Sequence, residues 1–144
     1  MTAPLSCWRC DSCGEPIDRL QDGYVVWHSR YGKVDDLNII HKGRCNDGSH
    51  VSSAELSRFL GPEGLSFALS LVSAGPIRLA GGYESPRTPA NLDAFVDFLR
   101  RVQVPYYEEA RPKFGEPTVR EAYRSMSDFG PYRVDALKSI SEDS

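Results

Sequence analysis

The pattern of hydrophobic and polar residues changes near residue 50. Before it, two runs rich in aromatic and β-branched side chains, residues 24–30 and 34–40, flank the turn-forming triplet Tyr31-Gly32-Lys33. Two such runs on either side of a short turn predict an antiparallel β-hairpin. After residue 50, apolar residues recur mostly at helical spacing, which predicts a series of short helices.

Local signals set the expected ends of these helices. Ser52-Ser53-Ala54-Glu55 has the form of a capping box and predicts a helix ending at Gly61. Pro62 is expected to open a second helix, and residues 92–102 carry an apolar stripe typical of a third. Further helices are predicted between Pro105 and Pro112, from the capping box at residues 118–121, and in the tail up to residue 140. Residues 76–90, rich in glycine and proline, are predicted to be a loop or a hairpin.

This pattern predicts an α+β fold with two parts. Residues 1–50 would form a zinc-stapled β-hairpin module, and residues 51–144 a bundle of short helices. The connection from Gly48 to Ser52 is too short for independent motion, so we expect the two parts to pack into one unit.

The staple is predicted from the cysteines, all four of which lie within the first 45 residues. Cys10 and Cys13 are separated by two residues, and His41 and Cys45 by three, with the predicted hairpin between the pairs. Three thiols and one imidazole in two such pairs indicate a closed tetrahedral zinc site with one structural ion. Disulfides are rare in a reducing cytosol, which also favours metal.

Cys7 offers an alternative, because Cys7-Trp8-Arg9-Cys10 has the same spacing as the pair that we prefer. Gly14 directly after Cys13 suits the tight turn of a zinc knuckle, whereas Trp8 would crowd such a turn. We therefore predict Cys10 and Cys13 as ligands and Cys7 as a spare thiol. The alternative is that Cys7 substitutes as a ligand or is a reactive thiol.

The spacing of the two pairs resembles that of treble-clef and related long-span zinc fingers, including the poly-ADP-ribose-polymerase type. The resemblance covers residues 7–50 and implies the four zinc ligands and a small sheet. It departs from that type at the second pair, which has three intervening residues here, and in the lack of a basic surface. It therefore does not imply recognition of DNA ends, and it gives no family for residues 51–144.

Charge argues against a dedicated nucleic-acid binder. The net charge is −3. Residues 1–45 carry six basic and six acidic side chains, and residues 91–144 carry eight basic and ten acidic ones. Phosphate binding usually requires a basic stripe, which these counts do not provide. No apolar run approaches the ~20 residues that span a bilayer, and residues 1–5 lack the form of a signal peptide, so we expect a cytoplasmic protein without membrane contact.

The second notable stretch, residues 104–114, interleaves aromatic and basic side chains. We predict that it binds a protein partner through Tyr106, Tyr107, Arg111, Lys113 and Phe114. Glu108 and Glu109 would repel phosphate, which favours protein over nucleic acid. The alternative is that the aromatic residues pack helices together, with their hydroxyls reaching the surface.

No group of residues in the sequence indicates catalysis. The predicted metal site has no open position, and no zinc-hydrolase motif supplies a general base. His28 and His50 are expected to be ordinary packed or surface residues. We therefore predict a non-enzymatic adaptor or regulatory protein. The alternative is a transcriptional regulator that places the helix starting at Pro62 or Thr118 in a nucleic-acid groove.

Overall fold

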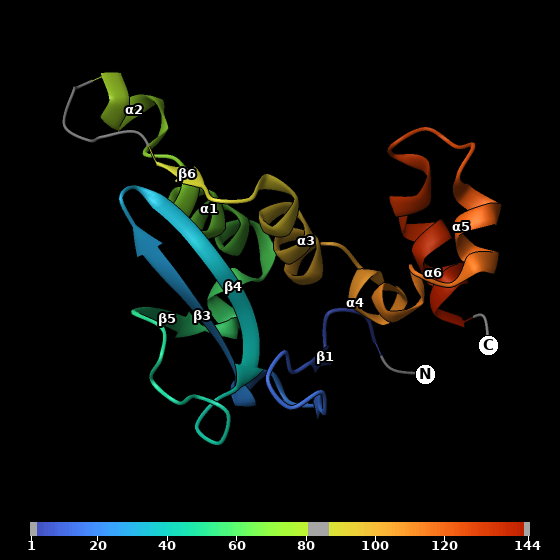
Figure 1. The fold of residues 1–144 in the computed structure, drawn as a ribbon, viewed down its shortest axis with the longest axis horizontal. Helices are drawn as coiled ribbons and strands as arrows, with labels where there is room; N and C mark the ends of the chain where they lie inside the picture. Colours follow the sequence, from blue (N-terminus) through green and yellow to red (C-terminus); the bar gives the residue numbers. More distant parts are fainter. Residues whose placement is uncertain (1–2, 81–86, 143–144) are drawn as a thin grey trace.

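The longest strands of the molecule form a curved antiparallel hairpin (Figure 1). The computed structural model describes residues 3–80 and 87–142. The hairpin consists of β3 (Gly23–Arg30) and β4 (Lys33–His41). Its connecting residues Tyr31 and Gly32 have φ angles of 53° and 76°, the left-handed conformations that a two-residue type I′ turn requires. The predicted hairpin is thus confirmed.

Two short strands complete this sheet, whose order is β5-β3-β4-β6. Strand β5 (Ser52–Glu55) pairs antiparallel with β3, and β6 (Thr88–Pro89) pairs parallel with β4. A second, smaller sheet is formed by β1 (Trp8–Arg9) and β2 (Pro16–Ile17). The loop between these two strands contains Cys10 and Cys13, so the small sheet holds the predicted knuckle in place.

Two long helices pack against the main sheet, and a group of shorter ones lies beyond its end (Figure 1). The long helices are α1 (Gly61–Val72) and α3 (Leu92–Gln103), while α2 (Gly75–Ala80) projects from the far end of the hairpin. The short helices are α4 (Tyr107–Ala110), α5 (Pro117–Tyr123) and α6 (Val134–Glu142). The predicted α+β class is confirmed.

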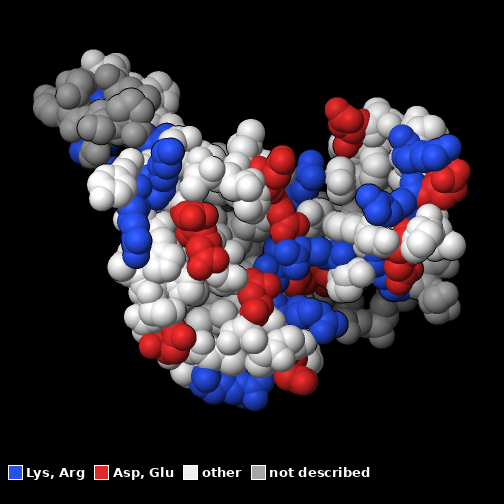
Figure 2. Space-filling view, in the orientation of Figure 1, with Lys and Arg blue, Asp and Glu red and all other residues white. Residues whose placement is uncertain are grey.

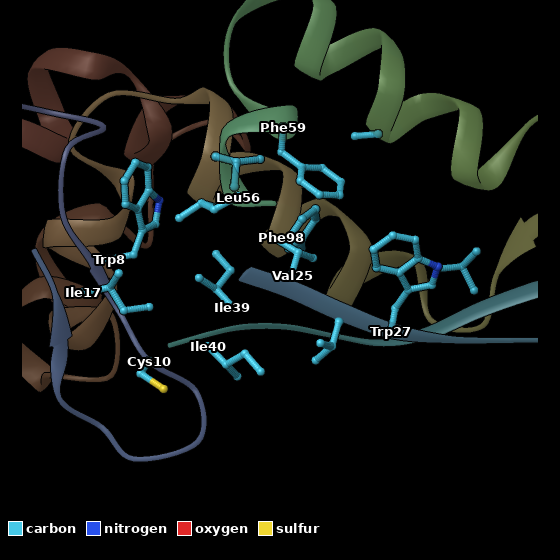
Figure 3. Packing of buried hydrophobic residues seen from close by; sticks show 14 residues of the cluster. Trp8, Cys10, Ile17, Val25, Trp27, Ile39, Ile40, Leu56, Phe59 and Phe98 are labelled. Carbon is cyan, nitrogen blue, oxygen red and sulfur yellow. The ribbon is translucent and has the colours of Figure 1, made fainter. Parts of the chain in front are cut away.

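The main core joins the knuckle, the sheet and both long helices. Figure 3 shows Trp8, Ile17 and Cys10 at one end of this cluster and Trp27 at the other, with Phe59 and Phe98 between the sheet and the helices. The ring of Phe59 meets those of Trp27 and Phe98 edge to face, with centroids 6.1 and 5.3 Å apart. A separate small core in the short helices consists of four buried residues, Tyr107, Ala110, Leu137 and Ile140.

Three local predictions were wrong. Residues 52–55 form strand β5 instead of a helix, and residues 56–59 form a 3₁₀ turn, because β3 offers an unpaired edge that β5 fills. Part of the predicted loop 76–90 belongs to α2, and its Gly81-Gly82 pair lies outside the described residues. The fifth helix begins at Pro117 with Glu116 as its N-cap, so Thr118 lies inside the helix and does not cap it.

Charges of both signs are interspersed on the face shown in Figure 2. Blue and red side chains adjoin one another near the centre of this view, and no broad basic stripe crosses it. This agrees with the balanced counts along the sequence and gives that face no resemblance to a nucleic-acid-binding surface.

Candidate metal centre

The four predicted ligands come together at the end of the sheet. Cys10 and Cys13 lie in the β1–β2 loop, His41 is the last residue of β4, and Cys45 follows in the next turn. Their ligand atoms all lie within 4.8 Å of one another. The chain therefore carries a three-cysteine, one-histidine cluster whose dimensions are compatible with a bound metal ion such as zinc.

The first pair is held as a knuckle by backbone hydrogen bonds. The amide of Gly14 donates to the carbonyl of Cys10 over 3.0 Å, and Gly14 has a φ of 79°, which glycine adopts at low cost. This turn directs the amides of Ser12 and Cys13 at the sulfur of Cys10, with N···S distances of 3.4 and 3.5 Å. Amides in this position stabilise a thiolate and tune it as a ligand.

The geometry of His41 fits tetrahedral coordination. Its Nδ1 lies 3.4 Å from the sulfur of Cys13 and 3.6 Å from that of Cys45. With ordinary zinc–sulfur and zinc–nitrogen bond lengths, a tetrahedron places sulfur and nitrogen about 3.6 Å apart. The other nitrogen, Nε2, lies 3.0 Å from the carbonyl oxygen of Pro16, to which its N–H can donate. Such a bond fixes the tautomer that leaves Nδ1 free for a metal.

The local electrostatics favour a thiolate at Cys10. Burial opposes ionisation, but the surrounding backbone amides outweigh it and lower the pKa of the Cys10 thiol to about 6. Desolvation and the neighbouring thiols Cys10 and Cys13 raise the pKa of Cys45, as expected where several thiolates would share a small volume. The guanidinium of Arg44 lies 3.8 Å from the sulfur of Cys13 and places a positive charge beside the cluster.

Asp11, inside the knuckle, ties the cluster to the sheet. Its amide donates to the carbonyl of Ile39 over 2.7 Å, and its carboxylate accepts from the amide of Ile39 over 2.8 Å. The same carboxylate oxygen accepts from Nη1 of Arg101, also over 2.8 Å. The knuckle is thus anchored to β4 and to α3 through one side chain.

Arg101 extends this link to the short helices. It is only 2% exposed and forms a bidentate pair with Glu108 of α4, with N···O distances of 2.7 and 2.9 Å. Nη2, one of the two nitrogens in this pair, also donates to the carbonyl of Arg9, and the carbonyl of Arg101 accepts from the indole of Trp8. Because each charged group has several partners, this buried network can connect the metal cluster to both helical regions without leaving an unpaired charge.

No motif in the sequence predicts this network. Asp11 lies between two candidate ligands, and Arg101 lies within residues 92–102, which are predicted to be a helix, with no pattern that pairs it with an acidic residue. The two are 90 positions apart, and no spacing rule connects them.

Cys7 lies outside the cluster. Its thiol contacts the carboxylate of Asp18 at 3.5 Å, and burial together with Asp18 raises its pKa. The structure therefore brings the preferred pair Cys10 and Cys13 together with His41 and Cys45 and leaves Cys7 out of the cluster.

The five residues predicted to contact a partner differ in how far they are exposed to solvent. Tyr107 is 4% exposed, and its hydroxyl donates to Asp97 over 2.6 Å. Its ring also meets that of Phe114, with centroids 5.2 Å apart. Tyr107 and Phe114 therefore pack helices together, as the alternative interpretation of this stretch anticipated, and Tyr107 is corrected from a surface contact to a core residue.

The remaining three residues are more accessible. Arg111 pairs with Asp97 at 2.7 Å and is about one-third exposed, and Lys113 donates to the carbonyl of Ser141. Tyr106 is half-buried and lines an open groove beside α6. Of the predicted set, Tyr106 is the aromatic residue that lines this groove.

Within residues 3–80 and 87–142, no helix combines the length and the apolar character needed to cross a bilayer. Comparison of the chain with protein-family models, with curated proteins and with solved structures gives no match.

Proposed function

We propose that this protein is a non-enzymatic adaptor in which a structural zinc ion stabilises the fold and the helical region binds a segment of another protein. Zinc is the ion of choice because three thiolates and one imidazole form a donor set that it favours. Bound there, the ion would supply folding free energy and no chemistry, since four protein ligands leave no position for a substrate.

The proposal that the helical region binds a protein segment rests on a groove at the end of the molecule formed by the short helices. It has a volume of about 860 Å³ and is lined mainly by apolar and aromatic side chains of the α3–α4 connection and of the segment leading into α6. Phe129 and Val134, both in this lining, are 66% and 47% exposed. Exposed aromatic residues beside a groove are typical anchors of a protein interface.

Charge around the groove indicates the chemistry of the segment that it would bind. Lys138 lies 5.8 Å from the ring centroid of Tyr106, and Arg100 stacks on Tyr132 at 4.1 Å. Arg133 also lines the groove, where Asp135 partly offsets its charge. We therefore infer that the partner segment carries an apolar or aromatic anchor residue flanked by acidic side chains.

Selection of peptides from a random displayed library on the zinc-loaded protein tests this proposal. Enriched peptides should share an apolar anchor next to Asp or Glu. Fluorescence polarisation should then show affinity at least about tenfold weaker for the Phe129→Ser and Lys138→Glu variants, because each removes one of the two recognition elements.

Ile77→Ser and Lys33→Glu are matched controls, because they replace an exposed apolar residue with serine and an exposed lysine with glutamate at positions away from the groove. Equal weakening by the controls, or no enrichment above an unrelated protein, would contradict the proposal. Binding of an oligonucleotide with a steep salt dependence would instead favour the nucleic-acid-binding alternative.

A further inference from the structure

A second group of ligand-type side chains lies on the hairpin itself. The ligand atoms of His28, Asp36 and His50 are all within 4.8 Å of one another. His28 belongs to β3 and Asp36 to β4, while His50 lies in the segment between β4 and β5. None of these three residues belongs to the cysteine-containing cluster.

A β-bulge brings Asp36 to this position. Val26 is paired with Asn38 and His28 with Asp35, so two residues of β4, Asp36 and Leu37, stand opposite one residue of β3. Asp36 has a φ of 56°, a left-handed conformation that aspartate and asparagine tolerate better than most residues. Bulges commonly redirect a side chain at a functional position.

Neighbouring side chains fix the orientation of Asp36 and His50. Asn38 donates to Oδ1 of Asp36 over 2.9 Å, which leaves Oδ2 to face Nε2 of His50 at 2.8 Å. On the other side of the imidazole, Nδ1 lies 3.3 Å from the hydroxyl oxygen of Ser49. In the tautomer whose Nδ1–H donates to Ser49, Nε2 keeps a lone pair on the side of the ring that faces Oδ2 of Asp36. Metal-binding histidines usually have an outer partner of this kind.

His28 supplies an independent indication. Its ring stacks on that of His50 with centroids 4.5 Å apart, and its Nδ1 is buried without a hydrogen-bond partner. In the described part of the chain, the only other buried side-chain atoms without a partner are the two carboxylate oxygens of Glu109. An unsatisfied buried polar atom is costly, so a histidine with one is better explained by a ligand than by packing alone.

We propose that His28, Asp36 and His50 form a second metal site, which binds a divalent first-row transition ion such as Zn²⁺ or Ni²⁺. Two imidazoles and one carboxylate suit these ions and leave coordination positions for water or a small anionic ligand. The carboxylate of Asp36 is 54% exposed, so the ion would exchange readily with solvent. His50 also lines a cleft of about 180 Å³ that extends to Cys45, which gives such a ligand room beside the site.

The test is a titration with Ni²⁺ of protein that carries one equivalent of zinc, monitored by calorimetry and by NMR of the three histidines. One equivalent fills the four-ligand cysteine-containing cluster first and leaves the three-ligand site free, so His41 serves as an internal reference. One Ni²⁺ should bind per chain, and the paramagnetic ion should broaden the signals of His28 and His50 but not those of His41.

Asp36→Asn is the decisive variant, because asparagine tolerates the same backbone conformation and can still accept from Asn38. It should weaken Ni²⁺ binding at least about tenfold, the lower end of what disturbing a metal site usually costs. Asp35→Asn is the matched control: it changes the adjacent carboxylate, keeps an acceptor for the amide of Asp36, and should leave binding unchanged.

Two outcomes would overturn the proposal. If Ni²⁺ does not bind, the group is an Asp36–His50 ion pair with a stacked histidine. If Ni²⁺ binds equally well to the Asp36→Asn variant, or broadens all three histidines alike, the ion binds surface imidazoles without a built site. Neither outcome depends on the groove or on peptide binding, so the proposed adaptor function would be unaffected.

Discussion

The two ends of this molecule are stabilised in different ways. At the sheet end, fourteen buried residues form one core, which includes Cys10 and adjoins the other three clustered metal ligands. At the end formed by α4, α5 and α6, the small core has four buried residues, and an open groove adjoins it. The larger core therefore lies where the metal would bind, and the groove that we propose to bind a partner lies beside the smaller core.

This difference has a consequence for experiments. A substitution at the sheet end is expected to affect the whole fold, because Asp11 and Arg101 connect the knuckle to the sheet and to both helical regions. A substitution in the small core is expected to act locally. Four predictions, in order of decreasing effect, separate these two behaviours.

The largest effect is expected at the metal cluster. The Cys13→Ser variant should lose the ion and with it about 10 kcal/mol of folding free energy, the order found for structural zinc in small modules. Thermal unfolding followed by circular dichroism measures this loss. Cys7→Ser is the matched control and should unfold like the natural chain. If both variants lose stability equally, Cys7 is a ligand and the assignment of the cluster is wrong.

The next largest effect is expected at the connection between the two ends. Arg101→Met should destabilise the fold by about 3–5 kcal/mol, because it leaves the carboxylate of Glu108 buried without its partner. The double variant Arg101→Met with Glu108→Gln removes that uncompensated charge and should recover part of the loss. Urea unfolding of the three proteins measures the differences. No recovery would mean that packing, and not charge pairing, is what Arg101 contributes.

The small core should show a smaller and more local effect. Leu137 is fully buried there, and Leu137→Ala should cost about 3 kcal/mol. Hydrogen exchange should rise in α4 and α6 while β3 and β4 keep their protection. An equal rise in the strands would show that the two ends unfold together and that their separation into two cores has no energetic meaning.

Tyr107 should show the smallest effect, together with a dependence on pH. Burial raises its pKa, as do the hydrogen bond to Asp97 and the charge of that carboxylate, so the folded state retains a proton that the unfolded state releases near pH 10. Its contribution is therefore complete below pH 10 and is lost as the pH rises further.

The variant that tests this is Tyr107→Phe. It should lose about 2 kcal/mol at neutral pH, the usual worth of one hydrogen bond to a charged group, and should lack the component with the highest pKa in a tyrosine absorbance titration. If Tyr107 ionised like an exposed tyrosine, its hydroxyl would be accessible, and the surface role first predicted for it would be restored.

The parts of this structure that follow from the sequence depend on contacts between near neighbours. Glycine after Cys13, the paired spacings of the ligands and the Tyr31-Gly32 turn each carry their own signal within a few residues. They predicted the knuckle, the hairpin and the four residues that cluster at its end.

The parts that were missed depend on distant partners. Residues 52–55 have the pattern of a helix start, yet they form a strand because they pair with the free edge of β3. His28, Asp36 and His50 each read as isolated polar residues, and only the bulge in β4 and the return of the chain after Gly48 bring them together. Charged neighbours predicted a surface position for Tyr107. One of these neighbours, Glu108, is itself paired with the buried Arg101, so its charge does not mark an exposed segment.

Native mass spectrometry of the purified protein, paired with a spectrum of the denatured chain, tests the central claim most directly. We predict at least one zinc ion that remains bound to the native chain, is absent from the denatured one, and is lost in the Cys45→Ser variant while the Cys7→Ser variant retains it. A folded, metal-free chain with four free thiols would contradict the claim that the cluster of Cys10, Cys13, His41 and Cys45 is a zinc site.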